Sequence, residues 1–198
     1  MMFFYPRIIN SEGTTYENVE EFTLLGVDFV SDQKLGVKWE KYISKLIKKA
    51  YNNIWILKRL VEMGVGRHDL LLAFQTRVRS HVEQNIALWH FAISNKLSSL
   101  IEKVQKTCAY IILGKHATPS YSRNLAILGL EQLYERREKL SGHFGRKTLK
   151  HPVHSQIFTF SKRSGTRSNQ KVPLIPYSRT RRYETSSIPS LSKLLNST

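Results

Sequence analysis

The sequence predicts a mainly α protein in which a small β-hairpin precedes a helical bundle and a basic, largely disordered tail follows it. Three observations lead to this prediction. Two runs near the start are rich in aromatic and β-branched residues, as strands are. Apolar residues then recur at steps of three and four as far as Phe144, as amphipathic helices require. Beyond that point serine, arginine and proline accumulate, so the 198 residues divide into 1–32, 33–150 and 151–198.

The predicted strands are MMFFYPRII at residues 1–9 and EEFTLLGVDFV at residues 20–30, with the turn-forming run SEGTT between them. Gly26 interrupts the second run, and a glycine inside a strand favours a bulge or a close approach of another backbone. The loop SDQKLG, residues 31–36, then leads into the first helix.

Residues 38–60, KWEKYISKLIKKAYNNIWILKRL, have one apolar side and one basic side and predict a long helix. The apolar stripe consists of Trp39, Ile43, Leu46, Ala50, Ile54, Leu57 and Val61. At 100° per residue, the opposite side carries Lys41, Lys45, Lys48, Asn52, Trp55 and Arg59. The stretch MGVG at residues 63–66 ends this helix.

Four more helical segments complete the predicted bundle. A second helix is expected to begin with Asp69 as its N-cap, and its inward stripe is Leu71, Phe74, Val78, Val82, Ile86 and Trp89. A third follows Asn95 and ends at Gly114, and its inward residues are Leu97, Ile101, Val104, Cys108 and Ile111. A short helix near 124–128 precedes a last one over 131–150, which carries Leu133, Arg137, Leu140 and Phe144.

The segment 151–198 differs in composition from the bundle. The stretch 139–183 contains no acidic residue, and the segment holds too few apolar residues to offset its ordering entropy. We therefore expect most of it to be disordered or draped on a partner, with IPSLSKLLN near its end able to dock. Lys162-Arg163 and the run Arg179–Arg182 resemble a loose nuclear-import or polyanion-binding patch.

The charge is unevenly distributed along the chain. The net charge is +16, yet residues 1–40 hold three basic and seven acidic side chains and so carry −4, which leaves +20 for the remainder. A surplus of this size indicates a polyanionic partner, either a nucleic acid or, less often, an anionic membrane surface.

The sequence also predicts where the protein resides. The single cysteine, Cys108, excludes an intramolecular disulfide and fits a reducing compartment. No apolar run approaches the roughly 20 residues that span a bilayer, and MMFFYP lacks the length and basic flank of a signal peptide. The expectation is a soluble intracellular protein, nuclear or cytoplasmic, with no membrane partner.

The distribution of aspartate and glutamate in the sequence indicates no catalytic residue, no metal site and no cofactor. Two-metal phosphoryl transfer needs clustered carboxylates, but the only aspartates are Asp28, Asp32 and Asp69, and the first two flank a predicted strand end where a turn-polar role is expected. Glutamates at 131, 135 and 138 lie among basic neighbours and favour ion pairs on a solvated face. The phosphate-cradling glycine loop and the nucleophile-elbow motif are both absent from the sequence.

The histidines and the cysteine are also weak candidates for a metal site. His143, His151 and His154 could be taken for a metal cluster, but the chain has one cysteine and a proline stands between the last two histidines. Cys108 lies on an apolar stripe, which favours a buried structural thiol.

The basic side of the first helix has two interpretations. Lysines opposite an apolar stripe are what any surface helix shows, so the side could simply be solvated. Alternatively, lysines one turn apart can follow a phosphate backbone, and an exposed Trp55 beside Asn52 offers a ring for a base or sugar. Trp55 could instead pack under the next helix, which would weaken the stacking argument but leave the charge argument intact.

A resemblance appears when the motifs are taken in order. The series VEEFTLLGVDF, LGVKWEKYISKLIKKA, RLVEMGVGRHDLLLAF, LWHFAIS and KVQKTCAYIILG resembles the C-terminal part of the reverse transcriptase of a non-LTR (LINE-like, jockey-like) retrotransposon. LAILGLEQLYERREKL and VPLIPYSRTRRYETSSIPSLSKLLN resemble the end of the same polyproteins. The resemblance covers about residue 19 to the end, and the order of the motifs makes it specific.

The resemblance implies palm-remnant strands with a grip-like hairpin at 1–32, a thumb-like bundle at 33–150 and a basic extension at 151–198. Leu25 and Gly26 would then belong to the hairpin that grips the primer. Trp39 and Ile43 would anchor the thumb helix inward, whereas Lys41, Lys45 and Lys48 would contact the nucleic-acid backbone.

The catalytic carboxylates of that family are expected upstream of Met1, so the chain should be a fragment that does not polymerise by itself. Mg²⁺ would serve only the intact parent polymerase. One departure from the family pattern, HVEQN at residues 81–85, suggests a degenerate copy and leaves the packing around Val82 open. The expected partners are RNA, DNA or an RNA–DNA hybrid, and possibly the missing catalytic part of the polymerase.

Two alternatives stay open at this stage. The chain could be a basic nuclear interaction or scaffold protein whose tail carries the activity. It could also be a translated pseudogene product without a selected role. The sequence does not distinguish among RNA, DNA and hybrid partners.

Overall fold

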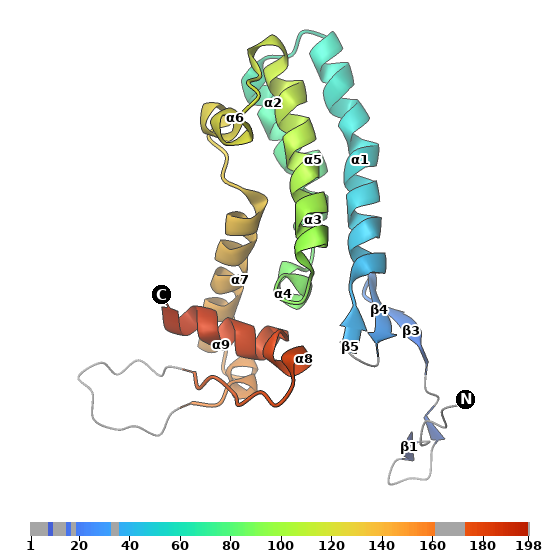
Figure 1. The fold of residues 1–198 in the computed structure, drawn as a ribbon, viewed down its shortest axis with the longest axis vertical. Helices are drawn as coiled ribbons and strands as arrows, with labels where there is room; N and C mark the ends of the chain where they lie inside the picture. Colours follow the sequence, from blue (N-terminus) through green and yellow to red (C-terminus); the bar gives the residue numbers. More distant parts are fainter. Residues whose placement is uncertain (1–7, 10–14, 17–18, 33–35, 161–172, 198) are drawn as a thin grey trace, which may run out of the picture.

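The fold is mainly helical, with a small three-stranded antiparallel sheet at one end of the helices (Figure 1). The computed structural model describes residues 8–9, 15–16, 19–32, 36–160 and 173–197. The predicted fold class is confirmed at this level. Of the predicted strand at 1–9, only β1 (Ile8–Ile9) lies within the described residues, and it pairs with β2 (Thr15–Tyr16).

The three-stranded sheet runs in the order β3 (Glu21–Leu24), β4 (Val27–Asp32), β5 (Gly36–Lys38). Leu24 pairs with Val27, so Leu25 and Gly26 form a two-residue hairpin turn, and both have positive φ, 49° and 79°. Such turns match the twist of the flanking strands, and glycine meets their φ without strain. Gly26 is therefore a turn residue, and the predicted bulge or close backbone approach is wrong, because among the described residues no atom beyond its chain neighbours lies within 4 Å of where its Cβ would be.

Helix α1 (Glu40–Glu62) presents the predicted stripe to the core. Every member of the stripe is buried except Val61, which is 40% exposed and was wrongly placed inside. Trp39 is buried just ahead of the helix, as its N-cap residue. Tyr42 is buried as well, because the sheet and the following helices enclose the start of α1 on more than one side.

The second predicted helix is divided into α2 (Arg67–Ala73), the π-helical η1 (Phe74–Arg79) and α3 (Ser80–Val82). Its N-cap is Gly66, and Asp69 lies in the first turn, so the N-cap assignment was wrong. A π turn contains more residues than an α turn, so the buried positions fall at different residues along the helix. Leu70 rather than Leu71 is therefore buried.

A left-handed residue separates this helix from the next short one, α4 (Ile86–Trp89). Asn85 adopts φ 53°, and its side-chain amide donates to the Tyr42 hydroxyl at 3.0 Å. Val82 is nevertheless fully buried, so the unusual HVEQN segment leaves the packing at Val82 intact.

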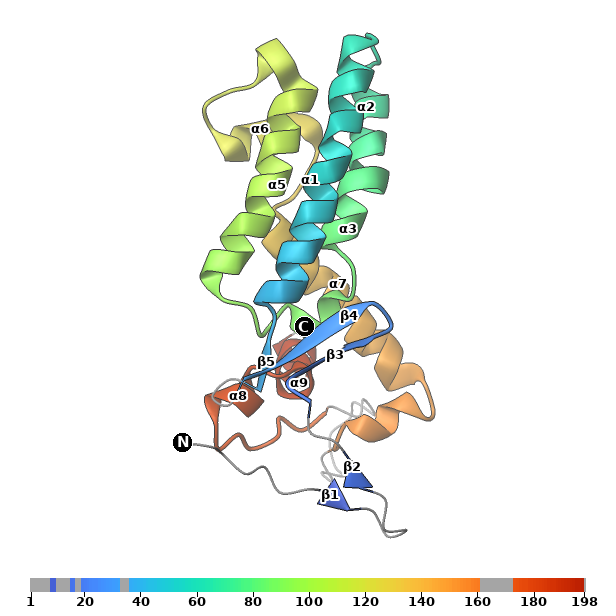
Figure 2. The same cartoon turned by 90° about the vertical axis from the view of Figure 1, so that its right-hand side faces the viewer.

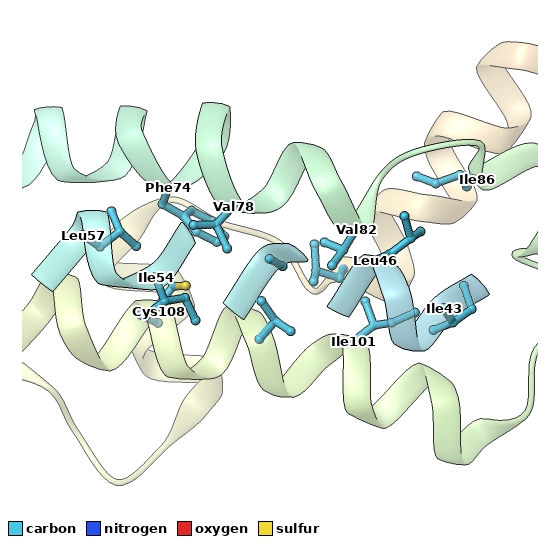
Figure 3. Close-up of a cluster of buried hydrophobic side chains, with 14 of the residues drawn as sticks. Ile43, Leu46, Ile54, Leu57, Phe74, Val78, Val82, Ile86, Ile101 and Cys108 are labelled. Carbon is cyan, nitrogen blue, oxygen red and sulfur yellow. The ribbon is translucent and has the colours of Figure 1, made fainter. Parts of the chain in front are cut away.

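Helix α5 (Asn95–Leu113) packs along α1, and the two enclose the core together with α2, η1 and α3 (Figure 3). The hydroxyl of Ser94 caps α5 by accepting from the Leu97 amide, and Gly114 ends the helix as predicted. Cys108 is buried, and burial raises its thiol pKa to about 12, which confirms the structural thiol. Figure 3 shows residues of α1 between two sets of side chains: Phe74 and Val78 on one side, and Ile101 and Cys108 on the other.

After the 3₁₀ turn η2 (Gly114–His116), helices α6 (Tyr121–Leu128) and α7 (Leu133–Lys150) close the bundle. Phe144, which continues the helical spacing of Leu133, Arg137 and Leu140, is 49% exposed and lies outside the buried face. The buried face of the C-terminal half of α7 is small-sided instead, and consists of Ser141, Gly142, Gly145 and Thr148.

The small-sided face of α7 receives the C-terminal helix α9 (Ser187–Ser197), which crosses α7 in Figure 1. A Cβ at Gly145 would lie 3.2 Å from Leu195 Cδ1, so glycine permits this close contact. The predicted docking of IPSLSKLLN is confirmed. The prediction of a largely disordered tail is wrong for the described residues 173–197, which include α9 and α8 (Arg181–Glu184); the patch at Lys162-Arg163 lies outside the described residues.

Candidate nucleic-acid interface

The outer side of α1 is the surface on which the predicted site residues meet. Figure 2 looks onto α1, which lies between α5 and the α2–α3 segment. Trp55 is 61% exposed there, so it does not pack under the next helix. Tyr51 precedes it by one turn and Lys58 follows it by three residues, and both are exposed. We call five exposed residues of this side the Trp55 face: Lys48, Tyr51, Asn52, Trp55 and Lys58.

The basic side chains at the start of α1 are engaged by the sheet. Lys41 Nζ lies 2.7 Å from Glu21 Oε2, and Lys45 Nζ lies 2.9 Å from Asp28 Oδ2. Asp28 is only 8% exposed and also accepts from the Thr23 hydroxyl at 2.8 Å. The hydrogen bonds from Lys45 and then Thr23 lower the pKa of its carboxyl below the ordinary value.

These contacts give two of the lysines a structural role. Lys41 and Lys45 hold the β3–β4 hairpin against α1 through ion pairs, so their charges are balanced by neighbouring acids. Arg59 likewise pairs with Glu62 at 2.8 Å. A phosphate would have to compete with these acids, whereas within the described part of the chain Lys48 and Lys58 form no ion pair.

We expect Lys45→Glu to lower the free energy of unfolding by about 1–2 kcal/mol, a figure that allows for partial solvent screening of the pair. The new carboxylate would face that of Asp28, which is buried and could not turn to solvent. Urea denaturation of the full chain measures the effect. Lys49→Glu, an exposed position of the same helix, is the control and should leave stability within about 0.5 kcal/mol; equal losses in both variants would refute a specific role for Lys45.

Two residues of the Trp55 face were not predicted. Tyr51 and Lys58 stand four residues before and three residues after Trp55, and on a helix such positions share a side. The spacing was therefore available in the sequence. Tyr51 was missed because tyrosine is as often a core residue as a surface one.

Glu135 and the three histidines at 143, 151 and 154 are exposed. Glu131 contacts Arg136 at 3.8 Å and also pairs with Lys139, as expected for these glutamates. The rings of His151 and His154 stack with centroids 3.9 Å apart. Over the described ranges, no group of three or more His, Cys, Asp or Glu side chains is placed to hold a metal ion. Among the same residues, no helix is long and apolar enough to cross a membrane.

Comparisons with protein-family models, with curated proteins and with solved structures find no match in any of the three.

Proposed function

We propose that the protein binds RNA, DNA or an RNA–DNA hybrid through the Trp55 face. One observation carries this proposal: a largely exposed indole stands between two lysines that have no acidic partner in the described structure. Exposed aromatic rings stack on bases or sugars with little sequence preference, and lysines one or two turns away neutralise phosphates. On a helix side that only faces solvent, an exposed tryptophan adds no stability, because its apolar surface stays in contact with water.

We further propose that the chain derives from the reverse transcriptase of a non-LTR retrotransposon. The ordered motifs support this origin, and the elements occur in the order that it implies: the β3–β4 hairpin with Leu25 and Gly26 at its turn, then the helices, then an extension ending in α9. In this proposal the hairpin is the palm remnant and α1 is the first thumb-like helix. This part of such a polymerase would contribute nucleic-acid binding, whereas phosphoryl transfer needs metal-binding carboxylates.

The test is a salt titration of the full chain binding to a labelled RNA–DNA hybrid, with single-stranded RNA and duplex DNA alongside. In duplex contacts log K falls by about 0.9 per neutralised phosphate for each log unit of salt. In the double variant Lys48→Glu/Lys58→Glu, the fall of log K per log unit of salt is expected to be smaller by about 2. Trp55→Ala should weaken binding by about 1–3 kcal/mol, roughly 5- to 150-fold, with the slope nearly unchanged, since stacking releases no counterions.

The matched control is the double variant Lys49→Glu/Lys103→Glu, which makes the same change in net charge at exposed positions outside the Trp55 face. It should reduce the slope less than the variant of the face does. Equal reductions in the two double variants would show that binding is spread over the whole basic surface. An unchanged affinity in Trp55→Ala would contradict the stacking contact.

A further inference from the structure

A second polar site lies on another part of the molecule, at the start of α5. A cavity of about 230 Å³ opens there between the first turns of α5, the first turns of α7 and the end of α4. Its polar wall residues are His90, Asn95, Ser98, Ser99, Tyr134 and Arg137. Asn95, Ser99 and Tyr134 are exposed, so the cavity is reached from solvent.

Arg137 is the unusual member of this wall. Its side chain is buried, with the whole residue 1% exposed, and its guanidinium carbon lies 5.5 Å from the centre of the Trp89 ring. Nη2 donates to the Ser98 hydroxyl at 2.6 Å, but Nε and Nη1 have no acceptor among the residues that the structure describes. No carboxylate of the described residues forms an ion pair with Arg137, which leaves a buried positive charge without a counter-ion.

Glu102 acts on Arg137 without forming an ion pair with it. Glu102 attracts the guanidinium electrostatically. Its Oε1, however, accepts from the Tyr121 hydroxyl at 2.5 Å and from the Leu133 amide at 3.1 Å. Burial lowers the pKa of the Arg137 guanidinium, and the structure provides no internal acid that neutralises it directly.

Other donors converge on the same cavity. The 19-residue helix α5 begins there, and its dipole places partial positive charge at the first turn. Ser98 accepts from Arg137 and therefore keeps its own hydroxyl proton for a ligand, and Ser99 and Tyr134 supply further hydroxyls. His90 contributes no positive charge near neutral pH, because burial and then Arg137 lower its pKa to about 4.

We propose that this cavity binds a small oxyanion of the phosphate class, as a free ion or as the phosphoryl group of a small molecule. A tetrahedral anion offers acceptor oxygens in several directions, which suits donors that come from two helices. Nε and Nη1 of Arg137 have no surface in the cavity, so the anion would be held by the charge of the guanidinium and by the wall hydroxyls. The proposal is independent of the Trp55 face.

The experiment follows the thermal midpoint of the full chain at pH 7 and constant ionic strength, with inorganic phosphate and glycerol phosphate as probes and chloride as the reference. The proposal expects a saturable rise in the midpoint with phosphate and none with chloride. A response to glycerol phosphate at lower concentration than to inorganic phosphate identifies an organic phosphate as the ligand. A response to inorganic phosphate at lower concentration than to glycerol phosphate identifies the free ion as the ligand.

Two variants at one position make the test independent of whether an Arg137 variant folds. Ser98→Asp places a carboxylate beside Arg137, so it should raise the midpoint without ligand and abolish the response to phosphate. Ser98→Asn has nearly the same shape without the charge and should not raise the midpoint. The proposal is overturned if chloride acts as phosphate does, or if Ser98→Asp stabilises no more than Ser98→Asn and still responds to phosphate.

Discussion

Replacing Trp89 by alanine is expected to lower the free energy of unfolding by about 3–5 kcal/mol. The indole is fully buried, and its Nε1 donates to the Gln84 carbonyl at 2.8 Å. The variant would leave a cavity, a carbonyl without its donor, and Arg137 without the ring that its guanidinium faces. Urea denaturation at neutral pH measures the loss as a lower midpoint with an unchanged slope.

Trp55→Ala is the matched control, because it removes the same ring from an exposed position. Its stability should stay within about 0.5 kcal/mol of the parent. The two variants therefore separate the roles of the two tryptophans: Trp89 is expected to be needed for folding, whereas Trp55 is proposed to bind nucleic acid. A large loss of stability in Trp55→Ala would mean that its ring packs in the core, and a negligible loss in Trp89→Ala would contradict the packing described for α4.

Stability should fall by about 3 kcal/mol as the pH is lowered from 7 to 4, because of one buried histidine. Burial, and secondly the positive charge of Arg137, lower the pKa of His90 from 6.5 to about 4. The unfolded chain takes up the proton near pH 6.5 while the folded chain does not, so stability is lost between these two pH values and levels off below about 4. At about 1.4 kcal/mol per pKa unit the whole difference is worth about 3.5 kcal/mol, of which about 3 kcal/mol is lost by pH 4, where the folded histidine is half protonated.

The pH dependence is measured by urea denaturation at a series of pH values. His90→Phe should flatten the curve between pH 6.5 and 4, since it keeps an aromatic ring beside Phe91 and Tyr134 but cannot be protonated. His68→Asn, at a side chain that is 91% exposed, should keep the slope of the parent. Asp28 contributes in another window, because its pKa is lowered from 3.8 and its stabilisation is lost only below that pH. A parent-like slope in His90→Phe would refute the assignment.

The helices were the most predictable part of the fold. The stripe of α1 was correct at every position but Val61, because burial along a regular helix follows the 3.6-residue period. The period failed where the backbone was irregular. Around the π turn of η1 the buried residues recur at steps of four, so Leu70 is buried where alternating steps of three and four had favoured Leu71.

The C-terminal helix shows a different limit. Composition predicted low order for the tail, yet α9 packs on α7 because Gly142 and Gly145 leave room for Leu194 and Leu195. The apolar anchors of α9 were visible in the sequence. Their partner was not, because a small-sided face does not look apolar when it is read as a stripe.

By itself, the sequence determined the helical class, the apolar side of each long helix and the basic character of the chain after residue 40. These properties depend on local periodicity and on composition. Only the tertiary structure decided which charges remain available to a ligand. Lys41 and Lys45 look equivalent to Lys48 along α1, but the hairpin brings Glu21 and Asp28 against the first two. The same holds for Arg137, whose lack of a counter-ion depends on where distant segments place their acids.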